Sequence, residues 1–367
     1  MVEWKTIREI AKRNKGIPIT AGQMNELASK DGNVRVFAAG STIADIDESR
    51  LPTNCAQRLP SIIVKSRGYI DFEFYEKPFT HKNEMWSYSF KEKEVGKFIY
   101  YYLTNKTDFF RKKAKANSVK LPQLCVADTD DYLIPILPFS EQTRIVGILD
   151  TFTASIENLK EQITLRRKQY EYYRDQLLDL EGKPGVEMKT IGEVGEICMC
   201  KRIMKNQTLE TGDVPFFKIG TFGGTPDAYI SKSLFEEYKN KYSYPKKGEI
   251  LISAAGTIGR TVVFDGEKAY YQDSNIVWIA NNEKLVSNRY LFYYYKTADW
   301  KTDGGTIKRL YNYNLKNMGI PVPSPQEQSR IVSILDTFEA SIANLEAQLK
   351  QREKQYEYYR NKLLTFE

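Results

Sequence analysis

The chain has 367 residues, and its 54 lysines and arginines against 47 aspartates and glutamates give a net charge of +7. At about 100 to 200 residues per domain this length predicts two or three domains, and the composition, 41% apolar and 28% charged, is typical of a globular protein rather than a disordered or disulfide-framed one. Because no apolar run approaches the roughly 20 residues of a membrane span and the first residues lack the apolar core of a signal peptide, we expect a cytoplasmic protein without membrane contact.

Residues 1–139 are predicted to form a globular lobe of mixed α/β structure. Residues 58–64 have the composition of a strand, and residues 97–103 have the pattern of a short helix. Basic side chains then crowd into about ten residues between Arg111 and Lys120, which suits a phosphate backbone; a solvated helix face is the alternative interpretation. The DNA-binding candidates of this segment are Lys65, Arg67, His81, Lys82, Asn83, Arg111, Lys112, Lys113, Lys115, Asn117 and Lys120.

Residues 140–181 are predicted to form one long helix. Apolar side chains recur at alternating steps of four and three, which are the a and d positions of a coiled coil over about five heptads. Arg166 interrupts this seam, and its stem is expected to pack while its charged head reaches solvent. Gly182 and Pro184 end the helix. At 1.5 Å per residue, about 40 helical residues span roughly 60 Å.

Residues 182–325 are predicted to form a second lobe of the same kind. Strand-like runs at 249–253, 261–264 and 275–280 are separated by turn residues, and the Gly-Thr-Ile-Gly sequence at 256–259 is predicted to be a hairpin turn. Arginine suits guanine, asparagine and glutamine suit adenine, and aspartate accepts from cytosine. On these grounds the DNA-binding candidates are Lys201, Arg202, Arg260, Gln272, Asp273, Ser274, Asn275, Thr306, Lys308, Arg309 and Asn312.

Residues 326–367 repeat the first helix. The 40 residues from Glu327 match those from Glu141 without a gap, with roughly 26 identities, so the chain is a tandem duplication. The break in the seam recurs too, as Arg352. Because each apolar seam needs a partner, we expect the two helices to bury their seams against each other. The predicted fold class is α+β: two globular α/β lobes joined by two long antiparallel coiled-coil helices, in a pseudo-twofold tandem arrangement.

Tyrosines and an arginine cluster in the later part of each helix, on and off the seam. They offer more apolar surface than a two-stranded contact covers, and Tyr and Arg are favoured at the centres of protein interfaces. We therefore predict a protein partner here, with a simple dimerisation stalk as the alternative. The predicted interface consists of Tyr170, Tyr172, Tyr173, Arg174, Tyr356, Tyr358, Tyr359 and Arg360.

The motifs of common enzyme classes are missing from the sequence. A single histidine and four scattered cysteines favour neither a metal site nor a Ser-His-Asp triad, and the cysteines are expected to be buried free thiols. Neither a phosphate-binding P-loop nor a dinucleotide fingerprint is present, and Asp71 and Glu73 only imitate a nuclease carboxylate cluster. We expect a non-catalytic binding protein. A scaffold whose lobes bind something other than DNA, and a self-contained nuclease, are the alternatives.

The order of these features resembles one family. Each lobe is followed by a Pro-rich approach (135–138 and 321–323), a Glu-Gln-x-Arg-Ile-Val sequence, a long helix and Tyr-Glu-Tyr-Tyr-Arg. This order of features occurs twice. It resembles that of the specificity subunit of type I restriction-modification systems, over essentially the whole chain.

The resemblance implies a division of labour. Residues 1–139 and 182–325 would be target recognition domains, each reading half of an asymmetric bipartite site in double-stranded DNA. Residues 140–181 and 326–367 would be spacer helices that set the gap and dock two modification (methyltransferase) subunits, which restriction (translocase/endonuclease) subunits then join. S-adenosylmethionine, ATP and Mg²⁺ would belong to those partners, and this chain would hold no cofactor or metal.

Overall fold

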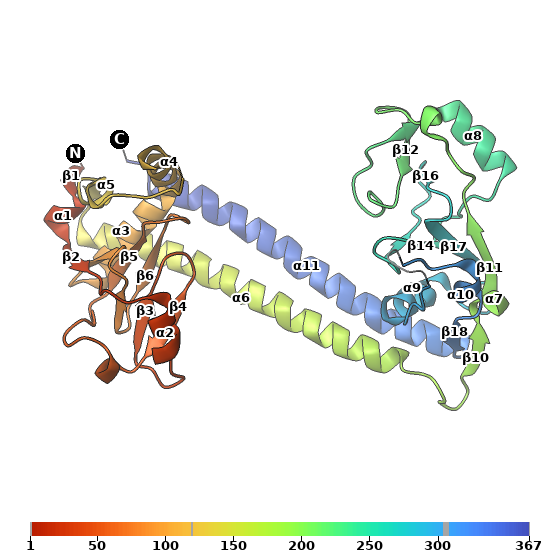
Figure 1. The fold of residues 1–367 in the computed structure, drawn as a ribbon, viewed down its shortest axis with the longest axis horizontal. Coiled ribbons are helices and arrows are strands. Elements are labelled where there is room, and N and C mark those ends of the chain that lie inside the picture. The colour runs from red at the N-terminus through yellow and green to blue at the C-terminus, as the bar shows by residue number, and fades with distance from the viewer. Residues whose placement is uncertain (1, 119, 304–307, 367) are drawn as a thin grey trace. The chain divides into compact units, whose positions relative to one another are not determined.

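The computed structural model describes residues 2–118, 120–303 and 308–366 (Figure 1). The chain folds as two compact units. The first consists of Met1–Lys160 with Ala347–Glu367, and the second is Glu161–Glu346. Each unit therefore contains one lobe and parts of both long helices.

The first lobe is built on two small sheets and a strand pair. β1 (Glu3–Thr6) pairs antiparallel with β9 (Leu133–Ile136). An antiparallel sheet has the order β2 (Lys12–Lys15), β8 (Trp86–Ser89), β5 (Ser61–Lys65) and β6 (Asp71–Tyr75). A second sheet has the order β4 (Ile43–Ile46), β3 (Val34–Phe37) and β7 (Phe79–His81), in which β3 and β7 run parallel. The helices are α1 (Ile7–Ile10), α2 (Ala21–Leu27), α3 (Lys93–Asn105), α4 (Thr107–Asn117) and α5 (Val126–Asp130), with a 3-10 turn at Glu48–Arg50.

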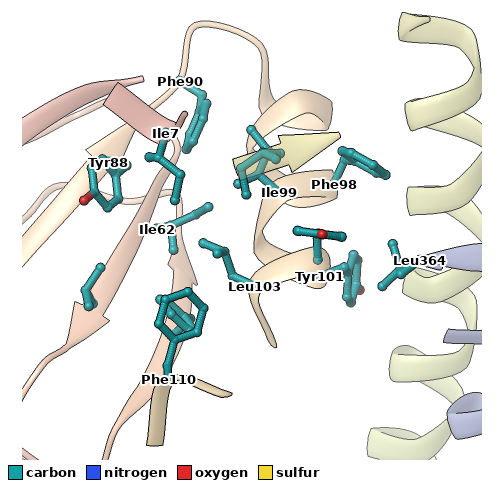
Figure 2. Packing of buried hydrophobic residues seen from close by; sticks show 14 of the residues in the cluster. Ile7, Ile62, Tyr88, Phe90, Phe98, Ile99, Tyr101, Leu103, Phe110 and Leu364 are labelled. Atoms are coloured by element: carbon teal, nitrogen blue, oxygen red, sulfur yellow. The ribbon is translucent and has the colours of Figure 1, made fainter. Parts of the chain in front are cut away.

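The core of the first unit lies on both sides of α3 (Figure 2). Ile99 and Leu103 face the sheet that contains Ile62, whereas Phe98 and Tyr101 face the long helices, where Leu364 is buried. Because α3 carries apolar side chains on two faces, one face packs on the sheet and the other packs on the long helices. The lobe is thereby packed onto the helices through a continuous core.

The second lobe repeats this architecture. β10 (Glu187–Thr190) pairs with β18 (Gly319–Val322), as β1 pairs with β9. One sheet has the order β11 (Gly195–Met199), β17 (Ile276–Asn281), β14 (Ile250–Ser253) and β15 (Thr261–Val263), and the other has the order β13 (Tyr229–Ile230), β12 (Val214–Phe217) and β16 (Tyr270–Tyr271). The helices are α7 (Ile191–Val194), α8 (Lys232–Lys241), α9 (Asn288–Thr297) and α10 (Asn312–Lys316), with a 3-10 turn at Lys205–Gln207.

The long helices are α6 (Phe139–Leu178) and α11 (Pro325–Leu363), and they run antiparallel within each unit. In the first unit Phe152 stacks on Tyr359 with ring centroids 5.4 Å apart, and in the second Tyr173 stacks on Phe338 at 5.5 Å. These two contacts correspond to each other in the duplicated sequence.

The arginines that interrupt the apolar seam cover aromatic rings. The guanidinium carbon of Arg166 lies 5.9 Å from the ring centroid of Phe338, and that of Arg352 lies 5.7 Å from that of Phe152. Because a guanidinium over a ring face is attracted to it, both breaks in the seam are accommodated as cation–π contacts.

The predicted fold class, two α/β lobes with two long paired helices, is confirmed. The sequence Gly256–Gly259 does connect two antiparallel strands, and both glycines have a positive φ. The strand predicted from residue 58 begins at Ser61, directly after Pro60, which cannot donate to a sheet. The predicted domain boundaries separate each lobe from its long helix. The two compact units instead each contain part of both long helices. The predicted boundaries and the pseudo-twofold arrangement therefore stay predictions.

Candidate nucleic-acid interface

Three segments of the first lobe converge at one edge: the β5–β6 loop, the β7–β8 loop and the segment before α5. The Ser66 hydroxyl donates to the backbone carbonyl of Glu84 at 2.7 Å. The backbone N–H of Leu124 donates to the carbonyl of Ser66 at 2.8 Å. The loops are thereby tied together by Ser66.

The corresponding segments of the second lobe converge in the same way. These are the β14–β15 loop, the β16–β17 loop and the segment before α10. The N–H of Ala254 donates to the carbonyl of Asn275 at 2.7 Å, and the N–H of Leu310 donates to the carbonyl of Ala254 at 2.9 Å. We call this three-segment feature of each lobe the loop edge.

Several candidates of the first lobe lie on its loop edge. Arg67, Asn83 and Lys120 are exposed there. Lys82 is half-buried and pairs with Glu84, with Nζ and Oε1 2.8 Å apart. Outside the edge, Lys65 on β5 pairs with Glu73 across the sheet at 2.7 Å. The edge therefore offers both basic and amide side chains, the types that contact phosphates and base edges.

His81 does not belong to any surface, contrary to the sequence-based prediction. Its side chain on β7 has no exposed area, and its Nε2 lies 3.2 Å from the hydroxyl oxygen of Ser87. Burial lowers the pKa of His81 because an imidazolium would lose its hydration there. A histidine enclosed in this way cannot reach a base edge.

The basic cluster on α4 is divided between structural and outward-facing side chains. Arg111 donates to the carbonyl of Ile70 at 3.2 Å and lies over the ring of Tyr69. Lys112 and Lys115 are exposed, and no ion pair involves them among the described residues. They are the members of the cluster best placed for a phosphate.

Asp128 engages two further members of that cluster. Lys113 lies 3.2 Å from its carboxylate, and Asn117 donates to it at 2.7 Å. Burial alone would raise the pKa of Asp128, but the hydrogen bonds from the backbone of Cys125, from Lys113 and from Asn117 outweigh burial and lower it. Lys113 and Asn117 therefore anchor α5 to α4.

The candidates of the second lobe gather more tightly. Arg202 pairs with Asp273, with Nε and Oδ2 2.8 Å apart. Arg309 donates to the side chain of Asn275 at 2.9 Å, and Gln272 accepts from a backbone N–H at 2.9 Å. They line a cavity of about 510 Å³ together with Ser274, Lys205 and Lys218.

The remaining candidates of this lobe have separate surroundings. Arg260 donates to the carbonyl of Phe222 at 2.9 Å, and the Nζ of Lys201 lies 5.1 Å from a tyrosine ring centroid. Lys308 and Asn312 are exposed. Thr306 lies outside the described residues.

Sequence reasoning missed Lys205 and Lys218. The spacing of Lys205, three residues after Arg202 in a basic stretch, was an available signal. Lys218 follows β12 and reaches the cavity only through the packing of the two sheets, so no local pattern indicated it.

The predicted tyrosine clusters serve two purposes. Tyr173 and Tyr359 stack across the helix pair, as described above. Tyr172 and Tyr358 are 58% and 61% exposed, so these side chains are available to another molecule. Tyr170 is half-buried, and its hydroxyl donates to Glu339 at 3.4 Å.

The other members of those clusters also lie against aromatic rings. Arg174 lies over the ring of Tyr170, with its guanidinium carbon 5.7 Å from the ring centroid. Arg360 lies over the ring of Tyr356 in the corresponding way, at 5.4 Å. The cation–π pairs thus recur in both repeats.

The cysteines are free thiols, but not all are buried. Cys200 is buried, which raises its pKa to about 12. Cys125 is exposed, so the expectation of burial is wrong for that residue. In the described part of the chain, no group of three His, Cys, Asp or Glu side chains is placed to hold a metal ion. Nor is any helix within residues 2–118, 120–303 and 308–366 both long and apolar enough to span a membrane.

Comparisons with known proteins agree on one family. The model of the type I restriction modification DNA specificity domain matches residues 1–166 and again 184–354. A putative type I restriction enzyme specificity subunit from Haemophilus influenzae is 45% identical over 100% of this chain and 96% of its own length. The EcoR124I/EcoR124II specificity subunit from Escherichia coli is 30% identical over 85% of this chain and 81% of its own length.

A solved structure shares the fold. The S subunit of a type I restriction-modification system from M. genitalium superposes with a TM-score of 0.63 at 16% identity, over 100% of this chain and 97% of the other. Two family-model matches that cover both lobes, and full-length similarity to a specificity subunit, identify this chain as a member of the type I restriction-modification DNA specificity family.

Proposed function

We propose that the chain is the DNA-recognition subunit of a type I restriction-modification complex, in which each lobe reads one half of an asymmetric bipartite site. The observation that supports this most is the recurrence of the loop edge. In both lobes, equivalent loops are tied together by hydrogen bonds and display basic and amide side chains. Lysines and arginines suit the phosphates, and arginine and amide groups suit base edges in the major groove.

We further propose that the long helices set the gap between half-sites and dock two modification subunits. Tyr172 and Tyr358 support the docking role because they are exposed at equivalent positions of the two repeats. Tyrosine is enriched among the residues that contribute most to protein interfaces. Equivalent positions on the two repeats suit two copies of one partner. Restriction subunits would join this assembly in the cytoplasm.

We assign all catalysis to those partners. Methyl transfer, with S-adenosylmethionine, and cleavage, with ATP and Mg²⁺, would belong to the modification and restriction subunits. The absence of a P-loop and a dinucleotide fingerprint from the sequence supports this assignment. A scaffold with non-DNA lobes is less favoured because family membership extends over both lobes.

The salt dependence of DNA binding tests the proposal. Phosphate contacts release counterions, so the logarithm of the binding constant should fall linearly with the logarithm of salt concentration, with a slope of about −0.9 per contact. Fluorescence anisotropy with labelled duplex DNA between 50 and 200 mM salt would measure the slope. A slope near zero, or no binding at the lowest salt, would contradict DNA recognition.

A further inference from the structure

The β16–β17 loop of the second lobe is held in an uncommon backbone conformation. Ser274 has a φ of 53°, in the left-handed region that non-glycine residues seldom occupy. Arg309 holds the loop there by donating to the carbonyl of Ser274 at 3.2 Å and to the side chain of Asn275 at 2.9 Å. Such conformations persist where surrounding contacts enforce them, and they are common at functional sites.

The loop presents Asp273 to Arg202. The side chain of Asp273 is 17% exposed and that of Arg202 is 65% exposed, and their contact uses the Nε of Arg202. A guanidinium has five N–H donors. Among the described residues, no other hydrogen bond of Arg202 is found, so both of its terminal nitrogens remain available to a ligand.

The surroundings of Arg202 favour an anionic ligand. Lys205, Lys218 and Arg309 line the same cavity of about 510 Å³. Lys218 is paired with Asp227 at 2.8 Å, and Arg309 is occupied by the loop. Lys205 is exposed and has no ion-pair partner in the described part of the chain. A nucleic-acid backbone would therefore be attracted here, close to the free end of Arg202.

We propose that Arg202 reads a guanine in the half-site bound by the second lobe, and that Asp273 is the positioning residue that aims it. This inference rests on the proposed DNA-recognition function. An arginine with two free terminal nitrogens can donate two parallel hydrogen bonds to the O6 and N7 of guanine, and no other base pair presents that pair of acceptors in the major groove. Arg309 is less suitable, because its guanidinium holds Ser274 and Asn275.

This assignment can be tested by measuring which bases the full chain prefers when it binds DNA in complex with its modification subunits. Binding would be measured to a duplex library randomised at each half-site position, for wild type, Arg202→Lys, Arg202→Ala and Asp273→Asn. Arg202→Lys keeps the charge but loses the two-pronged donor geometry. We expect it to lose about 10- to 100-fold discrimination for G·C at one position. Asp273→Asn should weaken preference at the same position by a smaller factor, since Arg202 is retained.

Lys205→Ala is the matched control, because it removes a positive charge from the same cavity. Loss of a phosphate contact should weaken binding to all sequences about equally and leave base preference unchanged. Circular dichroism and assembly with the modification subunits would verify that each variant is folded.

Two results would overturn the assignment. One is an Arg202→Ala variant that only weakens binding uniformly, as Lys205→Ala should, and the other is a wild-type second half-site without a G·C pair. A wild-type complex that binds no DNA would instead contradict the proposed function itself.

Discussion

The hydroxyl of Tyr101 donates a hydrogen bond to the carboxylate of Asp150 at 2.7 Å, which ties α3 of the first lobe to α6. The second lobe repeats the contact, with Tyr293 donating to Asp336 at 2.6 Å. A basic residue one turn earlier reaches the same carboxylate in each lobe: Lys97 in the first and Arg289 in the second. Each lobe is thus fixed to its long helix by a carboxylate that accepts from a tyrosine and a cation.

This anchor predicts a stability effect. Tyr101→Phe removes a hydrogen bond to a charged group, which typically contributes about 1.5–3 kcal/mol. We expect the free energy of unfolding in urea to fall by about that amount. Tyr358→Phe, at an exposed position, is the control and should change it by less than about 0.5 kcal/mol. Equal effects of the two substitutions would show that the Tyr101 contact does not hold the lobe.

The helix pair predicts a contrast between two positions of α6. Ile163 is buried in the seam, whereas Leu165 is 53% exposed two residues later. Ile163→Asp would bury a carboxylate without a partner, at a cost of several kcal/mol, and Leu165→Asp should cost little. Thermal unfolding and assembly with the modification subunits would be compared for both variants. An Ile163→Asp variant as stable as Leu165→Asp would mean that the seam is not structural.

The single histidine predicts a pH dependence of stability. Burial lowers the pKa of His81 in the folded state, so below the unfolded value of 6.5 the unfolded chain binds a proton that the folded chain does not. The free energy of unfolding should therefore rise with pH below about 6.5 and fall as the pH is lowered through that window. For one proton, the slope is at most about 1.4 kcal/mol per pH unit. Urea unfolding between pH 5 and 7.5 measures it.

His81→Gln is the matching variant, because it removes the titrating group and keeps polar atoms near Ser87. Its unfolding free energy should depend less on pH in that window than that of the wild type. Identical slopes for the two proteins would show that His81 does not contribute to the pH dependence.

The sequence predicted the helices and the duplication best. In the seam, apolar side chains recur on average every 3.5 residues, which is a local pattern. Residues such as Ile145 and Leu335 could therefore be assigned to a core from their spacing alone. The lobe contacts of Asp150 and Asp336 could not be assigned in this way, because their partners Tyr101 and Tyr293 lie 49 and 43 residues earlier in the sequence. His81 was misassigned for a related reason: a histidine followed by Lys82 and Asn83 suggests a surface loop, and only the packing of two sheets encloses it.

Some of the DNA-binding candidates selected from the sequence lie on the two loop edges, and their role in binding stays a prediction. The selected residues Lys82 and Asn83 in one lobe and Gln272 to Asn275 in the other occupy corresponding loops. That correspondence was not visible in the sequence, because the loops share no motif and the strands before them differ in length. Structural equivalence, rather than residue identity, relates the two loop edges.

The proposed spacing role of the helices predicts the effect of an insertion. A heptad inserted after Lys160 and another after Glu346, at equivalent positions, would keep the seam in register. Seven residues add about 10 Å, against about 3.4 Å per base pair, so the methylated motif should keep both half-sites while its gap grows by about one to three positions. A two-residue insertion would rotate the seam and is expected to abolish assembly. An unchanged gap after the heptad insertion would contradict the spacing role.

Independent reading of two half-sites is the central claim, and exchange of one lobe tests it most directly. Residues 1–139 would be replaced by the corresponding lobe of another family member, and the methylated motif would be determined by methylation-sensitive sequencing of host DNA. We predict that one half-site changes to that of the donor while the other half-site and the gap are retained. A change in both half-sites would contradict independent reading by the two lobes.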